Sequence, residues 1–112
     1  LAAYTASKAA VNAFTECLAL ELEPFNIKVR IVLPGAAPGT NFGKTAMARM
    51  QEQGGFPQAY AGFAQAIIAQ MQQSDAPRTQ SADVAQAVWR AATDPDCPMR
   101  LAAGADAVAL MD

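Results

Sequence analysis

Tyr4 and Lys8 are the residues of this chain whose types and spacing point most directly to chemistry. Tyr4 is predicted to open a helix, and helix positions i and i+4 lie one above the other on the same face. A phenol and an ammonium group would therefore lie side by side. Because a nearby cation favours the charged form of an acid, Lys8 should make the Tyr4 phenol more acidic than an isolated tyrosine. Such a phenol can give a proton to a carbonyl oxygen or take one from an alcohol.

The same spacing has a purely structural interpretation, in which Tyr4 packs near the helix start and Lys8 is a solvated charge. Spacing alone favours this second interpretation. The chemical interpretation gains weight only from the elements that surround the pair.

Two elements must position the pair. Residues 4–24 are predicted to form an amphipathic helix that Pro24 ends. Residues 27–33 are predicted to form a strand whose continuous apolar end favours a parallel sheet. A loop rich in proline and glycine follows at residues 34–43, at the sheet edge where open α/β sheets bind ligands, although an ordinary connecting turn is the alternative. The apolar stripe expected to be buried on the helix consists of Val11, Phe14, Leu18 and Leu22.

The rest of the chain is predicted to add helices and one more strand. The expected order is a short helix at 44–53 ended by Gly54-Gly55, a clearer helix at 57–73, a linker at 74–80, a helix from the N-cap Ser81 to Asp94-Pro95, a strand at 100–104, and a turn or helix at 106–111. The apolar, methionine-containing faces of the first two helices suit either a cover over a substrate or plain packing.

Composition excludes several classes of protein. The chain has 112 residues, 53% of them hydrophobic, and a net charge of −2, which predicts one packed domain with a modest core. The absence of histidine removes Ser-His-Asp and Cys-His catalysis and most zinc sites. No basic run is present, so nucleic acid and anionic membranes are not expected partners. No apolar run approaches the roughly 20 residues that span a bilayer.

The two cysteines, Cys17 and Cys97, lie far apart and lack metal-ligand spacing. They are expected to be free thiols in a reducing compartment. No signal-peptide pattern precedes Tyr4, so the expected localisation is cytoplasmic.

Together these segments resemble the C-terminal part of a short-chain dehydrogenase/reductase, in order and over nearly the whole chain. The segments that carry the resemblance are Tyr4-Thr5-Ala6-Ser7-Lys8-Ala9-Ala10-Val11, Glu21-Leu22, the strand from Ile27 that ends at Pro34-Gly35, Ser81-Ala82-Asp83-Val84-Ala85, and Leu101-Ala102-Ala103-Gly104-Ala105-Asp106-Ala107. The resemblance implies an α/β fold, the C-terminal half of a Rossmann-type doubly wound parallel sheet in the order helix-strand-helices-helix-strand. Residues 1–112 would form a partial NAD(P)-binding domain, with 42–75 as the substrate-binding loop and helices.

The resemblance also implies an oxidoreductase that interconverts a carbonyl and an alcohol by hydride transfer with NAD or NADP. Tyr4 would be the general acid/base, and Lys8 would assist it and hydrogen-bond the nicotinamide ribose. The remaining cofactor-binding residues would be Pro34, Gly35 and Ala37 at the nicotinamide end and Thr40 near the carboxamide and diphosphate. The expected partners are a small carbonyl or alcohol substrate of hydrophobic character and other copies of the chain in a homo-oligomer.

The family's glycine-rich diphosphate turn and its catalytic serine are not found in these 112 residues. Activity is therefore expected of a longer parent protein rather than of this stretch alone. One alternative is a non-catalytic half-domain that self-associates through its uncovered faces. Another is a small helical interaction protein, which would explain the amphipathic helices but not the order of Tyr4, Lys8 and Pro34-Gly35.

Overall fold

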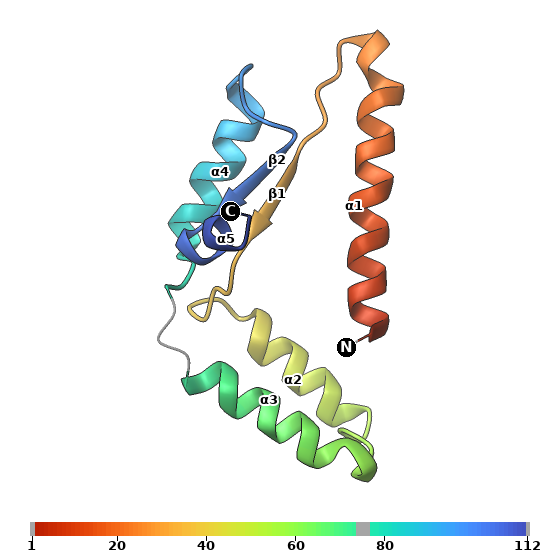
Figure 1. The fold of residues 1–112 in the computed structure, drawn as a ribbon, viewed down its shortest axis with the longest axis vertical. Helices are drawn as coiled ribbons and strands as arrows, with labels where there is room; N and C mark the ends of the chain where they lie inside the picture. The colour runs from red at the N-terminus through yellow and green to blue at the C-terminus, as the bar shows by residue number, and fades with distance from the viewer. Residues whose placement is uncertain (1, 74–76, 112) are drawn as a thin grey trace.

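The computed structural model describes residues 2–73 and 77–111, in which helices alternate with two short strands (Figure 1). Residues 74–76 lie outside the described residues. They include the end of the predicted substrate region, at 74 and 75, and the start of the predicted linker. In chain order the elements are the α-helix α1 (Ala2–Leu22), the 3-10 helix η1 (Glu23–Phe25), the strand β1 (Ile31–Pro34), α2 (Phe42–Glu52), the 3-10 helix η2 (Gln58–Tyr60), α3 (Ala61–Gln73), α4 (Ser81–Thr93), β2 (Arg100–Ala103) and α5 (Ala105–Met111). The α/β class is confirmed.

The two strands form a parallel pair, as the apolar strand end predicts. Ile31 lies opposite Arg100, and Pro34 lies opposite Ala103. Parallel neighbours need a long crossover, and here the chain passes through α2, α3 and α4 before it returns along β2. The carboxyl ends of both strands therefore meet at one edge of the sheet, where the loop after Pro34 begins.

The predicted strand boundaries, 27–33, are wrong at both ends. The observed strand β1 begins four residues later and extends to Pro34. A strand needs a neighbour for its backbone groups, and β2 begins only at Arg100. The Ile31 N–H donates to the Met99 carbonyl at 2.7 Å, and no described strand lies beside the preceding residues. The alternating apolar residues before Ile31 therefore have no described strand with which to form backbone hydrogen bonds.

The helices are confirmed, with shifted ends. The first helix begins at Ala2 and ends at Leu22, two residues before Pro24. Pro24 itself lies in the 3-10 helix η1. The second begins at Phe42 and ends as its glycines predict, because Gly54 and Gly55 adopt positive φ angles of 95° and 74°. The helix predicted at 57–73 opens as η2 and continues as α3.

The prediction that Ser81 is the N-cap of α4 is wrong, because Ser81 is the first residue of the helix. Gln80 occupies the N-cap, and its N–H donates to Asp83 Oδ2 at 2.8 Å. The carboxylate in the first turn therefore satisfies a backbone donor as well as the helix dipole.

The core lies where α4 and α5 cover the sheet. Its buried apolar residues around the strands are mostly small, namely Ile31, Ala87, Cys97, Ala103 and Ala107. Small side chains let the helices approach the strands closely, but they bury little apolar area each. Both Cys17 and Cys97 are free thiols, as expected.

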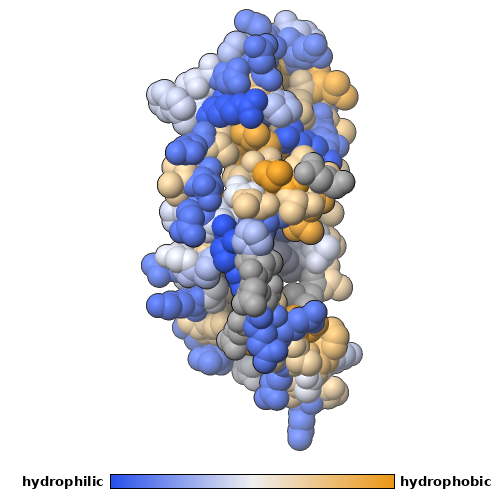
Figure 2. Space-filling view, turned by 60° about the vertical axis from the view of Figure 1, so that its left-hand side comes forward, coloured by the Kyte–Doolittle hydropathy of each residue, from blue (hydrophilic) through white to orange (hydrophobic). Residues whose placement is uncertain are grey.

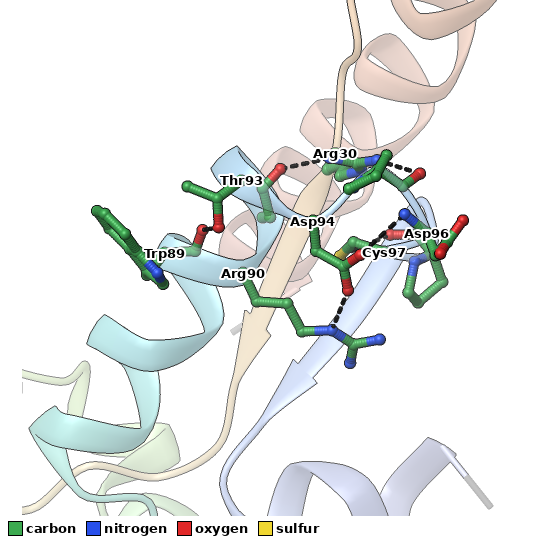
Figure 3. A network of polar contacts seen from close by, with 10 residues as sticks. Arg30, Trp89, Arg90, Thr93, Asp94, Asp96 and Cys97 are labelled. Atoms are coloured by element: carbon green, nitrogen blue, oxygen red, sulfur yellow. Dashed lines mark hydrogen bonds and ion pairs between the residues drawn. The ribbon is translucent and has the colours of Figure 1, made fainter.

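Arg30 joins the start of β1 to the end of α4 (Figure 3). Its Nη1 donates to the Ala91 carbonyl at 2.6 Å, and its Nη2 donates to the Pro95 carbonyl at 3.2 Å. Carbonyls in the last turn of a helix lack intrahelical donors and carry partial negative charge, so a guanidinium stabilises them. The side chain before the strand thus orients the helix that covers it.

Asp94 closes the same end of α4 (Figure 3). Its carboxylate accepts from Arg90 Nε at 3.0 Å and from the Asp96 N–H at 2.9 Å. The hydrogen bond from Arg90, followed by that from Asp96, lowers the pKa of Asp94. The turn that leads to β2 is therefore held by a charged group that stays ionised.

No residue of the stripe predicted to be buried on the first helix is buried, and its Leu18 and Leu22 are only half-buried. Val11 and Phe14 are 58% and 67% exposed. Figure 1 shows α1 on the opposite side of the strands from α4 and standing apart from them, and an ion pair of 3.4 Å joins Glu16 to Arg100 of β2. Apolar side chains also reach the surface on the face that Figure 2 shows. A periodic apolar stripe indicates the capacity for burial, and burial itself requires a covering surface.

None of the described helices is long and apolar enough to cross a membrane.

Candidate active site

Tyr4 and Lys8 lie one turn apart near the start of α1. The Lys8 Nζ is 5.7 Å from the centre of the Tyr4 ring, which is within cation–π range. The Tyr4 side chain is 52% exposed and is therefore accessible to another molecule. The structure brings the phenol and the ammonium group together, whereas their role in catalysis stays a prediction.

Tyr4 lines an open cleft of about 420 Å³ between the start of α1 and α2. The other lining residues come from one segment, and they are Phe42, Thr45, Ala46, Arg49, Met50 and Gln53. Their spacing of three and four residues places them on one face of a helix. The cleft thus joins Tyr4 to the first helix of the region predicted to bind substrate.

The cleft combines an apolar wall with a few polar groups. Phe42, Ala46 and Met50 supply the wall. The phenol of Tyr4, a hydroxyl and a guanidinium from α2, and the amide of the C-cap residue Gln53 supply the polar groups. Small-molecule sites commonly combine apolar lining with a few polar groups in this way. No residue of α2 is buried, so the cleft is open to solvent.

The predicted cofactor residues of the loop directly follow β1. Pro34 ends the strand, and the Gly35 N–H donates to the Ala103 carbonyl at 3.2 Å. The Ala37 carbonyl accepts from the Thr40 N–H at 3.1 Å and from Thr40 Oγ1 at 2.8 Å. These bonds fold the loop into a turn at the carboxyl edge of the sheet.

The structure therefore shows two groups of predicted site residues. One is the pair of side chains on α1, and the other is the loop at residues 34–40. Neither Lys8 nor any of these loop residues lines the cleft with Tyr4.

Asp106 and Thr79 hold the loop, and sequence reasoning assigned neither to the site. Asp106 Oδ2 accepts from the Ala36 N–H at 2.8 Å, and its Oδ1 accepts from the Thr79 hydroxyl at 2.6 Å. The Thr79 N–H in turn donates to the Ala36 carbonyl at 2.9 Å. Thr79 is 1% exposed. Three segments that are distant in sequence are thereby fastened at one point.

The hydrogen bond from Thr79, and then those from the backbone of Ala36 and Ala107, lower the pKa of Asp106. These donors favour the ionised carboxylate, because an anion accepts such bonds more strongly than a neutral acid does. The carboxylate is thus kept charged against its partial desolvation.

Two glycines make room for these contacts. A Cβ at Gly35 would collide with the Asp106 carboxylate, and a Cβ at Gly104 would collide with the Thr79 side chain. Gly104 also has a φ of 102°, which ends β2 and favours glycine. The Gly-Ala-Asp run after the last strand is the one sequence signal for this cluster, since it places a carboxylate in the first turn of α5.

Residues 1–51 match the family model described as short chain dehydrogenase. This segment is similar to short-chain dehydrogenases. All six predicted site residues lie within this segment. The 2,3-dihydro-2,3-dihydroxybenzoate dehydrogenase of Bacillus subtilis (strain 168) is 56% identical over 36 residues, which are 32% of this chain and 14% of that protein. No solved structure matches the chain.

Replacing Gly35 with alanine should destabilise the protein by about 1–3 kcal/mol, because the new methyl group displaces the Asp106 carboxylate. Urea denaturation of the two proteins measures the difference. Gly39→Ala is the matched control, since a Cβ there meets no atom within 4 Å, and it should change stability by less than about 0.5 kcal/mol. Equal effects of the two substitutions would contradict the close approach at Gly35.

The lowered pKa of Asp106 predicts a pH dependence of stability. Its contribution is complete above the unfolded-state pKa of about 3.9 and is lost as pH falls through the lower folded-state value. Thermal denaturation of Asp106→Asn should therefore show a reduced midpoint at pH 7 and a smaller difference from the wild type as pH falls below about 4. Asp96→Asn, in the exposed turn before β2, is the control for loss of charge. A constant difference between wild type and Asp106→Asn at all pH values would refute the assignment.

Proposed function

We propose that the protein is an NAD(P)-dependent oxidoreductase that interconverts a carbonyl and an alcohol by hydride transfer. The observation that carries this proposal is the pairing of Tyr4 with Lys8, 5.7 Å from ring centre to Nζ, inside the segment that matches the short chain dehydrogenase model. The cleft beside Tyr4 supports it by giving a small molecule access to the phenol. The curated relative, by its name, acts on a dihydroxy compound, which agrees with an alcohol substrate.

Tyr4 is the proposed general acid/base. In reduction its hydroxyl gives a proton to the substrate oxygen as hydride reaches the carbonyl carbon, and in oxidation its phenolate takes the alcohol proton. Lys8 stabilises the phenolate by Coulomb attraction across the face of α1. Because both groups belong to one helix, their relative position is set before substrate arrives, which lowers the entropic cost of reaction.

The loop at residues 34–40 would hold the nicotinamide end of the proposed cofactor, NAD or NADP, which would supply or accept the hydride. Backbone carbonyls of the loop suit the N–H donors of a carboxamide. The Gly35 N–H, the Thr40 N–H and the Thr40 hydroxyl already donate to the Ala103 and Ala37 carbonyls, so a bound cofactor would have to share or replace these bonds. The close approach of Gly35 to Asp106 and the internal bonds of Ala37 keep the loop in one conformation. Pro34, Gly35, Ala37 and Thr40 are the residues that would contact the cofactor.

The proposed architecture is the C-terminal half of a doubly wound Rossmann-type sheet, with residues 42–75 as the substrate region. The long crossover between parallel strands supports it, as do α1 and α4 on opposite sides of them (Figure 1). The cleft supports the substrate assignment for α2, and its apolar wall favours a substrate of hydrophobic character.

The apolar stripe of α1, with its exposed residues Val11 and Phe14, is the proposed contact face of a homo-oligomer. Sedimentation velocity should show a concentration-dependent oligomer, because burial of Val11 and Phe14 removes apolar area from water. Phe14→Glu should weaken association at least about tenfold by placing a charge in the interface. Phe56→Glu, in the turn between α2 and η2, is the matched control with 40% exposure. Wild-type protein that remains monomeric at high concentration would exclude this proposal.

Tyr4→Phe should lower kcat by about 100-fold or more while the cofactor Kd stays similar, because it removes only the transferable proton. Steady-state kinetics and NAD(P)H fluorescence titration measure the two quantities on the intact protein. Tyr60→Phe makes the same chemical change on η2, outside the cleft, and its effect on kcat should be at least about tenfold smaller.

Lys8→Met tests the second role in the same assays. It should lower kcat and also raise the cofactor Kd, because Lys8 is proposed to contact both Tyr4 and the ribose.

Full activity in Tyr4→Phe would disprove the assignment of Tyr4 as the acid/base.

A further inference from the structure

We propose that Arg49 makes the cleft beside Tyr4 select substrates that carry a carboxylate on an apolar body. The inference rests on the proposed function for the carbonyl or alcohol chemistry at Tyr4. It adds the charge of the substrate and the residue that recognises it.

The position of Arg49 on α2 is the first argument. The six lining positions of this segment fall within one side of the helix, and Arg49 lies near the middle of them, with Phe42 two turns before it and Met50 next to it. Tyr4 closes the cleft from α1. A molecule in the cleft therefore meets a phenol, a guanidinium and an apolar wall together.

The balance of charge is the second argument. None of the residues that line the cleft is acidic. Among the described residues the ion pairs are Arg90 with Asp94 and Arg100 with Glu16, so Arg49 has no carboxylate partner there. Lys8, 5.7 Å from the Tyr4 ring, adds a second positive charge near the same end of α1. The site thus has positive charge that a bound anion would neutralise.

The chemistry of the side chain is the third argument. A guanidinium presents parallel N–H donors that match the two oxygens of a carboxylate, and these charge-assisted bonds are among the stronger ones in proteins. Because the cleft is open and Arg49 is exposed, the apolar wall shields only one side of such a bond from water. The ligand class that uses every part of the cleft therefore has a carbonyl or hydroxyl for Tyr4, an apolar middle and a carboxylate for Arg49.

The test compares two ketones of nearly the same shape, 4-acetylbenzoate and 4-acetylbenzamide, which differ in charge at one end. Their Kd values are measured by calorimetry on the intact protein, and their kcat/KM values are measured with NADH and NADPH. The wild type should bind the carboxylate at least about tenfold more tightly than the amide, as expected for charge-assisted hydrogen bonds. In Arg49→Gln this ratio should fall to about one, while Arg49→Lys should retain part of it because the charge remains.

Lys44→Gln is the matched control, because it removes the same charge from the opposite side of α2 and does not line the cleft. Its binding ratio should equal that of the wild type. Retention of the ratio in Arg49→Gln, an equal loss in Lys44→Gln, or no binding of either ketone by the wild type would overturn the inference.

The two readouts separate this inference from the proposed function. An Arg49-dependent binding preference without turnover of either ketone supports the carboxylate site and counts against these ketones as substrates. A lack of turnover with any carbonyl or alcohol refutes the oxidoreductase proposal. Turnover of both ketones at equal kcat/KM, with no binding preference, supports the oxidoreductase and refutes the role of Arg49.

Discussion

The hydrogen bonds that the Asp106 carboxylate accepts from the Ala36 N–H and the Thr79 hydroxyl are the constraint on which the sheet edge depends. They join α5 to the loop after β1 and to the segment before α4, and Thr79 is buried at their meeting point. The apolar core around the strands consists largely of alanine, so each core residue contributes little area. Polar bonds with fixed partners and geometry therefore specify this edge more than apolar packing does. The contacts are close enough that Gly35 and Gly104 are required beside them.

The Tyr4–Lys8 pair depends on a different kind of constraint. Its geometry follows from helix spacing within α1 and needs no contact with the sheet. Among the described residues an ion pair between Glu16 and Arg100 joins this helix to β2, and such an exposed pair contributes little to stability. The local chemistry of the pair is thus robust, whereas its distance from the loop at residues 34–40 depends on whatever covers the apolar stripe of α1.

This difference explains how much could be predicted from the sequence. Helices, the parallel strand and the turn at Gly54-Gly55 follow from periodicity and from residues that end helices, so their existence was predictable and only their ends shifted. The start of β1 depends on where β2 begins, 69 residues further along the chain, and no local pattern contains that information. The same holds for Thr79 and Asp106, which are ordinary polar residues until the fold brings them to Ala36.

The cleft shows why specificity can change separately from stability in such an arrangement. No residue of α2 is buried, so a substitution on this helix removes little of the packing that stabilises the fold. One side of the same helix nevertheless faces Tyr4, where each side chain can contact a ligand. If the cleft binds substrate as proposed, a change there would alter which molecule is held against the phenol without moving the phenol itself. Under the proposed function, the general chemistry would reside in a pair fixed by helix geometry, and the choice of substrate would reside in an exposed helix.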